Sequence, residues 1–190
     1  MSRLLVSQYH TEVAKIIQYG GSKKETSIRN AFERLLNDYC KPRNYMLIPE
    51  LDYKTKFNTK VYPDGTVKDA IRLEHGWWES KDEYDILDEE IEKKFKKGYP
   101  DENILFEDSQ TAVLIQHGRE QFRVSMKDAD ELDGLISTFV DYERPEVRDF
   151  RAAIKAFRDD IPHILEALRD EIKKAERENE KFRDRRNPFF

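Results

Sequence analysis

Residues 67–81 have the sequence VKDAIRLEHGWWESK, in which two strand-like runs lie on either side of a glycine. β-Branched and aromatic residues favour strands, and glycine is preferred at the left-handed last position of a three-residue hairpin loop. We therefore predict an antiparallel hairpin with strands at 67–73 and from 77 onward, joined by the loop Glu74-His75-Gly76.

The predicted register of this hairpin gathers charged side chains on one face. A three-residue loop pairs Ile71 with Glu79 and Asp69 with Lys81. Directly paired residues point to the same face of a sheet, and side chains alternate between the two faces along a strand. Asp69, Glu79 and Lys81 are therefore expected to converge, with Ser80 on the opposite face.

Two carboxylates and one ammonium group on a strand face suit the hydrolysis of a phosphodiester. This reaction requires neutralised phosphoryl charge, a hydroxide formed near neutral pH and a stabilised leaving oxygen. The carboxylates of Asp69 and Glu79 suit Mg²⁺, for which we expect Mn²⁺ to substitute, and the backbone carbonyl of Ser80 offers a further ligand. Lys81 would orient or deprotonate the attacking water.

These residues match a known signature. Asp69, nine intervening residues and Glu79-Ser80-Lys81 follow the D-x(n)-(D/E)-x-K pattern of the PD-(D/E)xK nuclease superfamily. Charged residues make up 38% of the chain, so the pattern alone has low specificity. A wider set of segments resembles the amino-terminal, Mrr-like nuclease domain of type ISP restriction-modification enzymes, namely residues 62–69, 76–82, 103–109 and 112–116.

The resemblance implies a fold, an activity and partners. The implied fold is an α/β (mixed α+β) restriction-endonuclease-like core, with a central mixed sheet flanked by helices. The implied activity is Mg²⁺-dependent cleavage of DNA, with helicase, methyltransferase and target-recognition regions following in the same polypeptide. We expect the nuclease core at residues 1–144 and a helical extension at residues 145–190 that connects it to those regions.

Two aspartates compete for the first metal position that the resemblance implies. The aspartate of the superfamily usually follows a proline, but Lys68 precedes Asp69, whereas Pro63-Asp64 is a literal Pro-Asp pair. Because Pro-Asp-Gly-Thr is typical of a turn, we predict Asp69 as the ligand and keep Asp64 as the alternative.

The superfamily often adds two further polar residues to the site. One is a glutamate of the first core helix, for which Glu33 is the candidate; a solvent-exposed helix glutamate is the equal alternative. The other lies near the strand that follows, where Gln116 is a weaker candidate and Asp108 weaker still.

A basic stretch precedes the signature. Lys54, Lys56 and Lys60 alternate with Tyr53 and Phe57. Such a stretch can contact DNA phosphates, although solvated loop lysines are the commoner explanation. We predict DNA binding by these three lysines.

Composition limits the other function classes. The 190-residue chain has a net charge of −5, which argues against a stand-alone DNA binder but not against a nuclease domain delivered to DNA by other regions. It has one cysteine, Cys40, and four dispersed histidines, so no zinc-ligand spacing is present. No phosphate-binding loop of the GxxxxGK(S/T) type occurs, so we expect no ATP site. No apolar run is long enough for a membrane span, and we expect a cytoplasmic location.

Hydrophobic periodicity predicts the other elements. Helices are expected at 4–18, 87–97 and 130–142, and a further helix with its apolar stripe at 28–39 is expected to follow a capping box at 22–25 and to stop before Pro42; strands are expected at 45–51, 103–106, 111–116 and 121–126. The helix at 87–97 is read as a crossover that makes the Glu79 strand and the 111–116 strand parallel. In the extension, Pro162 predicts a new helix start or a kink.

Two rival functions remain open at this point. The first is a non-catalytic interaction module that keeps the nuclease fold and works through its carboxy-terminal helices. The second is a nuclease that acts on RNA or on repair intermediates, for which the sequence carries no aromatic RNA-binding signature. Metal binding by the paired carboxylates separates the interaction module from a nuclease.

Overall fold

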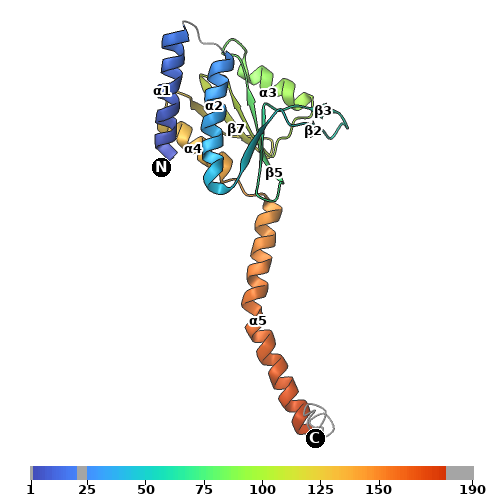
Figure 1. Cartoon of the computed structure of the whole chain (residues 1–190). Helices are drawn as coiled ribbons and strands as arrows, with labels where there is room; N and C mark the ends of the chain where they lie inside the picture. Colours follow the sequence, from blue (N-terminus) through green and yellow to red (C-terminus); the bar gives the residue numbers. More distant parts are fainter. Residues whose placement is uncertain (1, 21–24, 179–190) are drawn as a thin grey trace. The chain divides into compact units, whose positions relative to one another are not determined.

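The computed structural model describes residues 2–20 and 25–178 (Figure 1). The chain divides into two units, Met1–Tyr142 and Glu143–Phe190. The elements of the first unit are α1 (Ser2–Gly20), α2 (Glu25–Cys40), η1 (Lys41–Arg43), β1 (Met46–Pro49), β2 (Tyr53–Lys54), β3 (Lys60–Val61), β4 (Gly65–Lys68), β5 (Glu74–Ser80), α3 (Leu87–Lys96), β6 (Asn103–Glu107), β7 (Thr111–Gln116), β8 (Arg119–Ser125) and α4 (Ala129–Val140).

The first unit is built on a six-stranded mixed sheet in the order β1-β4-β5-β6-β7-β8. All neighbours in this sheet are antiparallel except β5 and β6, which are parallel and joined by α3. The predicted fold class, a mixed sheet flanked by helices, is confirmed. The predicted parallel orientation of the Glu79 strand and the 111–116 strand is wrong: β6 lies parallel to β5, and the short connection at 108–110 turns β7 back antiparallel to β6.

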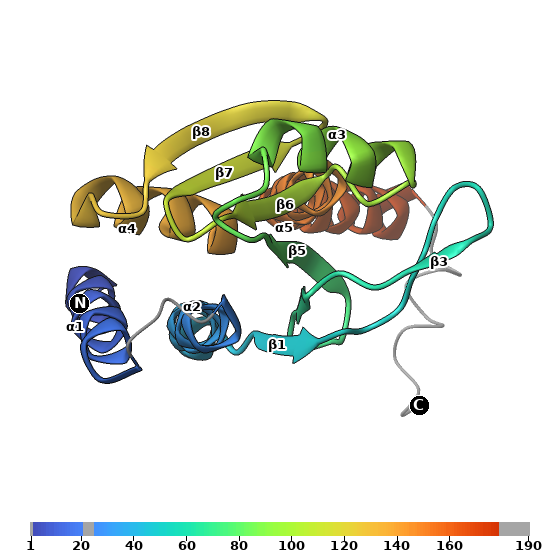
Figure 2. The same cartoon turned by 90° about the horizontal axis from the view of Figure 1, so that it is seen from above.

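Helices cover both faces of the sheet. In Figure 1, α1, α2 and α4 lie on one side and α3 on the other; Figure 2 shows α1 and α2 side by side, and the two helices are in contact. The two adjacent tryptophans of β5 point to opposite faces of the sheet. Trp78 packs in the core under α1, α2 and α4, and Trp77 packs in the core under α3. This alternation places Glu79 on the α3 side and Ser80 on the α2 side.

The β4–β5 hairpin forms, but its predicted register is wrong. Lys68 pairs with Glu74 and Gly65 with Trp78, so residues 69–73 form the turn. Asp69 Oδ1 accepts hydrogen bonds from the backbone amides of Ile71 (3.0 Å) and Leu73 (2.9 Å), which closes this turn.

Gly76 lies inside β5 rather than in the loop because the chain passes close to two other elements there. A Cβ at this position would lie 2.7 Å from the Phe139 ring and 2.7 Å from the Asn103 side-chain nitrogen. These contacts come from α4 and β6, so they fix the hairpin register from outside it.

The described residues of the second unit include the helix α5 (Pro145–Glu178), with Pro162 inside it. The helix therefore continues through the position where a new start was one of the two predicted outcomes. Residues 179–190 of the predicted extension lie outside the described residues. Within the described part of the chain, no helix is both long and apolar enough to cross a membrane.

Candidate functional site

Asp64, not Asp69, lies next to the Glu79-Ser80-Lys81 segment. Gly65 begins β4 and pairs with Trp78, so the residue before β4 reaches the end of β5. Asp64 Oδ2 accepts a hydrogen bond of 2.8 Å from the Ser80 backbone amide. The literal Pro63-Asp64 pair thus occupies the place that the sequence interpretation gave to Asp69, which instead closes the turn at the other end of β4.

Glu79 is the buried carboxylate of the site, with 2% of its side chain exposed. Its Oε1 accepts hydrogen bonds from Lys81 Nζ (2.8 Å) and from Lys94 Nζ. Its Oε2 is buried without a hydrogen-bond partner among the described residues. An unpartnered buried carboxylate oxygen is costly, and a bound cation would satisfy it.

Lys94 and Tyr99 belong to this cluster, although the sequence analysis did not predict either. Lys94 Nζ donates to Tyr99 Oη (3.0 Å) and lies 4.6 Å from the centre of the Tyr99 ring. The Tyr99 hydroxyl donates to the Tyr62 carbonyl (3.2 Å), two residues before Asp64. Burial, and then the nearby Glu79 carboxylate, raises the pKa of Tyr99 to about 12, so its hydroxyl remains a donor at neutral pH.

A sequence signal for Lys94 exists. It lies three residues after Ile91, which α3 buries against the sheet, and residues three apart share a helix face. Other lysines lie near the end of α3, where the helix dipole explains basic residues. The sequence therefore did not distinguish Lys94 from these lysines.

Arg29 of α2 approaches the site from the other face of the sheet. Its guanidinium pairs with Asp64 (2.9 Å) and more loosely with Glu50 (3.8 Å), and it lies over the Trp78 ring. Glu33 is half-buried and lies one helical turn after Arg29, on the same face of α2. Among the described residues it has no hydrogen bond or ion pair, so its predicted role stays a prediction.

Gln116 is not at the site. It pairs with Asn103 at the start of β6, whereas Glu79 pairs with Phe106 near the opposite end of that strand. Gln116 Nε2 donates to Asn103 Oδ1 (3.0 Å). Asp108 accepts from the amides of Gln110 and Thr111 and so closes the β6–β7 turn.

The predicted DNA-binding lysines lie on the small β2–β3 hairpin, which leads directly into Pro63-Asp64. Lys60 forms an ion pair with Asp52 (2.8 Å). Lys54 and Lys56 have no carboxylate partner in the described residues. The hairpin packs against Gly98, the residue before Tyr99, since a Cβ at Gly98 would lie 2.9 Å from both Thr55 and Phe57.

Glu107 is a buried acid that the sequence analysis missed. It pairs with Ser80 across β5 and β6 and therefore lies on the α2 side, behind Glu79. Its Oε2 accepts from the Ser109 amide (2.9 Å), and burial raises its pKa to about 7. Its neighbourhood in strand β6 is apolar, which is why no charge pattern revealed it.

The donor set of the site suits one metal more than others. The described residues hold no group of three or more histidine, cysteine, aspartate or glutamate side chains able to bind a metal. Asp64, Glu79 and the Ser80 carbonyl offer only oxygen ligands and few of them. Mg²⁺ prefers hard oxygen ligands and keeps several waters, so such a sparse set fits it.

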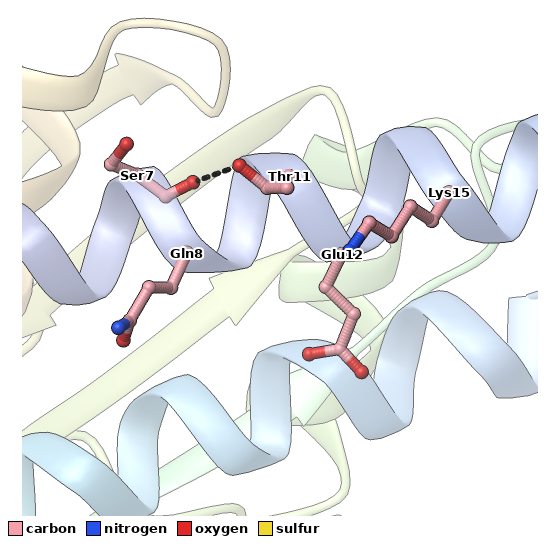
Figure 3. Close-up of a pocket in the computed structure, with 5 residues that line it drawn as sticks. All are labelled: Ser7, Gln8, Thr11, Glu12 and Lys15. Atoms are coloured by element: carbon pink, nitrogen blue, oxygen red, sulfur yellow. Dashed lines mark hydrogen bonds between the residues drawn. The ribbon is translucent and has the colours of Figure 1, made fainter.

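A separate surface hollow on α1 has no part in this cluster. Figure 3 shows its lining residues, Ser7, Gln8, Thr11, Glu12 and Lys15. The Thr11 hydroxyl donates to the Ser7 carbonyl of the same helix (2.9 Å). None of the residues around Glu79 lines it, and we assign it no function.

Comparison with known proteins gives matches among solved structures. No protein-family model and no curated protein matches the chain. Among solved structures, the chain is similar to a chain of a DrdV–DNA complex, at 45% identity and a TM-score of 0.80, over 92% of this chain and 17% of that one. The chain thus spans about a sixth of the DrdV chain. A protein from Anabaena variabilis described as a nuclease of the DUF820 family is 14% identical, with a TM-score of 0.42 over 63% of this chain and 83% of that one, too low to carry an argument.

Proposed function

We propose that the chain is a Mg²⁺-dependent DNA endonuclease domain of a restriction-modification enzyme. The observation that carries the proposal is the meeting of Asp64, Glu79 and Lys81 at one end of the β4–β5 hairpin. Oε2 of Glu79 is buried there without a partner. A pair of carboxylates beside a lysine is the arrangement that metal-assisted phosphodiester hydrolysis requires.

Asp64, Glu79 and the Ser80 carbonyl would hold the metal, with Glu33 as a further candidate. When bound, Mg²⁺ supplies Lewis-acid catalysis and acidifies water. Lys81 has 13% of its side chain exposed, and its Nζ is in contact with Glu79, so it can donate a hydrogen bond to an attacking water and hold it in line. The water oxygen bonds to phosphorus while one ester bond breaks. The water gives up a proton, and the leaving oxygen takes one up.

DNA is the proposed substrate. The similar DrdV chain was determined in complex with DNA. Lys54 and Lys56 belong to the β2–β3 hairpin, which leads along the chain into Pro63-Asp64, and they would contact phosphates of the bound DNA.

We further propose that helicase, methyltransferase and target-recognition regions follow in the same polypeptide, which would act in the cytoplasm. The matched part of DrdV is only 17% of that chain, which supports a larger setting for this domain. Residues 145–190 would then connect the nuclease core to those regions.

Cleavage of supercoiled plasmid in Mg²⁺ and in Mn²⁺ tests the proposal. The wild-type protein should cut, and Glu79→Gln should not, because the amide lacks the charge that holds a cation. Glu92→Gln is the matched control, since Glu92 is an exposed glutamate of α3 that pairs with Lys96. Mn²⁺ calorimetry accompanies the assay. If the wild-type protein neither cuts nor binds Mn²⁺, the non-catalytic interaction module is the better account.

A further inference from the structure

Two ammonium groups share one oxygen of Glu79. Lys81 and Lys94 both donate to Oε1, and neither donates to Oε2. Their side chains are 13% and 15% exposed, and that of Glu79 is 2% exposed. Lys81 lies two residues after Glu79, directly beyond the end of β5, as the nuclease signature requires, whereas Lys94 comes from α3 and is not part of that signature.

Lys94 has a second binding position beside the first. The Tyr99 oxygen accepts from its Nζ at 3.0 Å, and the ring face lies 4.6 Å from the same atom. An aromatic face and a hydroxyl oxygen both attract an ammonium group. Tyr99 is held in place by its hydrogen bond to the Tyr62 carbonyl and by its backbone amide, which donates to the Lys94 carbonyl (3.2 Å).

We propose that Lys94 competes with the metal for Glu79 and thereby sets the metal affinity of the site, while Tyr99 retains the displaced ammonium group at its edge. This inference rests on the proposed function. An ammonium group and a dication in contact with one carboxylate repel each other strongly at low local dielectric. A metal at the unpartnered Oε2 would therefore repel Lys94 at Oε1 and favour its displacement toward Tyr99, and the work of moving it weakens the binding.

The arrangement also explains how the metal-free site tolerates its buried charge. Glu79 is nearly inaccessible to water, and a buried carboxylate is stable only when it is paired. Lys94 supplies part of that pairing until a metal arrives.

Calorimetric titration of Mn²⁺ into the purified protein tests this inference without relying on cleavage. Lys94→Met should bind Mn²⁺ about tenfold more tightly than the wild-type protein, because the competing charge is gone. Lys94→Arg keeps the charge and should retain the weaker binding. Lys93→Met removes a charge from the neighbouring exposed position, which pairs with Glu90 (2.7 Å), and should leave the affinity unchanged.

The outcomes separate the two proposals. If Lys94→Met binds Mn²⁺ no more tightly than the wild-type protein, the competition is refuted while the nuclease proposal stands. If Lys93→Met gains as much Mn²⁺ affinity as Lys94→Met, the loss of any nearby positive charge explains the gain, and direct competition by Lys94 is refuted. If the wild-type protein and all variants fail to bind Mn²⁺ although circular dichroism shows them folded, the metal site itself is refuted, and both proposals fall together.

Discussion

The carboxylate of Asp64 accepts a hydrogen bond from the backbone amide of Ser80, at 2.8 Å. This contact joins the Pro63-Asp64 turn to the end of β5 and places a second carboxylate beside Glu79. Arg29 binds the other oxygen of Asp64 (2.9 Å) and limits how the carboxylate can rotate. Because of these two contacts, Asp64 is the first candidate metal ligand to test.

Asp64→Asn should lower cleavage by about a hundredfold or more, because it removes a ligand charge that acts on the reacting metal. Asp69→Asn is the matched control. Its side-chain oxygen can still accept from the Ile71 and Leu73 amides, so both the turn and the activity should persist. Rates of plasmid nicking under single-turnover conditions measure both. If activity is lost in Asp69→Asn and kept in Asp64→Asn, Asp69 is the metal ligand, as the sequence predicts.

Lys81→Met should abolish cleavage while Mn²⁺ binding is retained. The ammonium group of Lys81 is proposed to hold the attacking water, and it is not a metal ligand. Lys96→Met serves as the control, since Lys96 is exposed on α3 and pairs with Glu92 (3.1 Å). Parallel nicking assays and calorimetry give the two readouts. Cleavage by Lys81→Met at the wild-type rate would remove the residue from the mechanism.

Glu107 should make stability depend on pH. Burial raises its pKa from the ordinary 4.5 to about 7, so the folded state keeps a proton that the unfolded chain releases. The free energy of unfolding should therefore fall as the pH rises from about 4.5 to about 7, by about 3 kcal/mol at most.

Urea unfolding at pH 5 and pH 8 measures this effect. Glu107→Gln cannot ionise, so its stability should change less between the two values than that of the wild-type protein. Glu92→Gln, at an exposed position, should follow the wild-type protein. Identical pH profiles for wild type and Glu107→Gln would mean that Glu107 titrates normally in the folded state.

Two glycine substitutions test what determines the hairpin register. Gly76→Ala should destabilise the protein by about 1–3 kcal/mol, because the added Cβ overlaps Phe139 and Asn103. Gly134→Ala in α4 has open space around its Cβ and should stabilise the helix by about 0.5–1 kcal/mol. Thermal and urea unfolding give both values. Equal effects at the two positions would show that the close contact at Gly76 does not restrict the register.

The β2–β3 hairpin should contribute electrostatically to DNA affinity. Replacing Lys54 and Lys56 together with alanine should reduce the salt dependence of DNA binding by about two units of slope, since each lysine neutralises one phosphate. Lys60→Ala should have a smaller effect because Lys60 is already paired with Asp52. Fluorescence anisotropy at several salt concentrations, with Ca²⁺ in place of Mg²⁺, is the measurement. An unchanged slope in the double variant would place the DNA elsewhere.

Most helices of the first unit and two residues of the candidate site could be predicted from local sequence patterns, whereas β2, β3 and the register of the β4–β5 hairpin could not. Periodic apolar residues predicted α2, α3 and α4, because a helix face repeats within a few residues of the chain. Glu79 and Lys81 were identifiable because two residues apart on one strand always share a face. Local patterns of this kind require no knowledge of distant contacts.

Contacts between distant parts of the chain determine which aspartate lies beside the Glu79 strand. The register of β4 against β5 depends on how closely Gly76 meets Asn103 and Phe139, which are far away along the chain. Lys94 and Tyr99 reach the site because the crossover lays the end of α3 over the end of β5. The site is assembled from separate strands and helices, so it depends on how these elements pack. Packing between residues far apart along the chain cannot be inferred from a local sequence pattern.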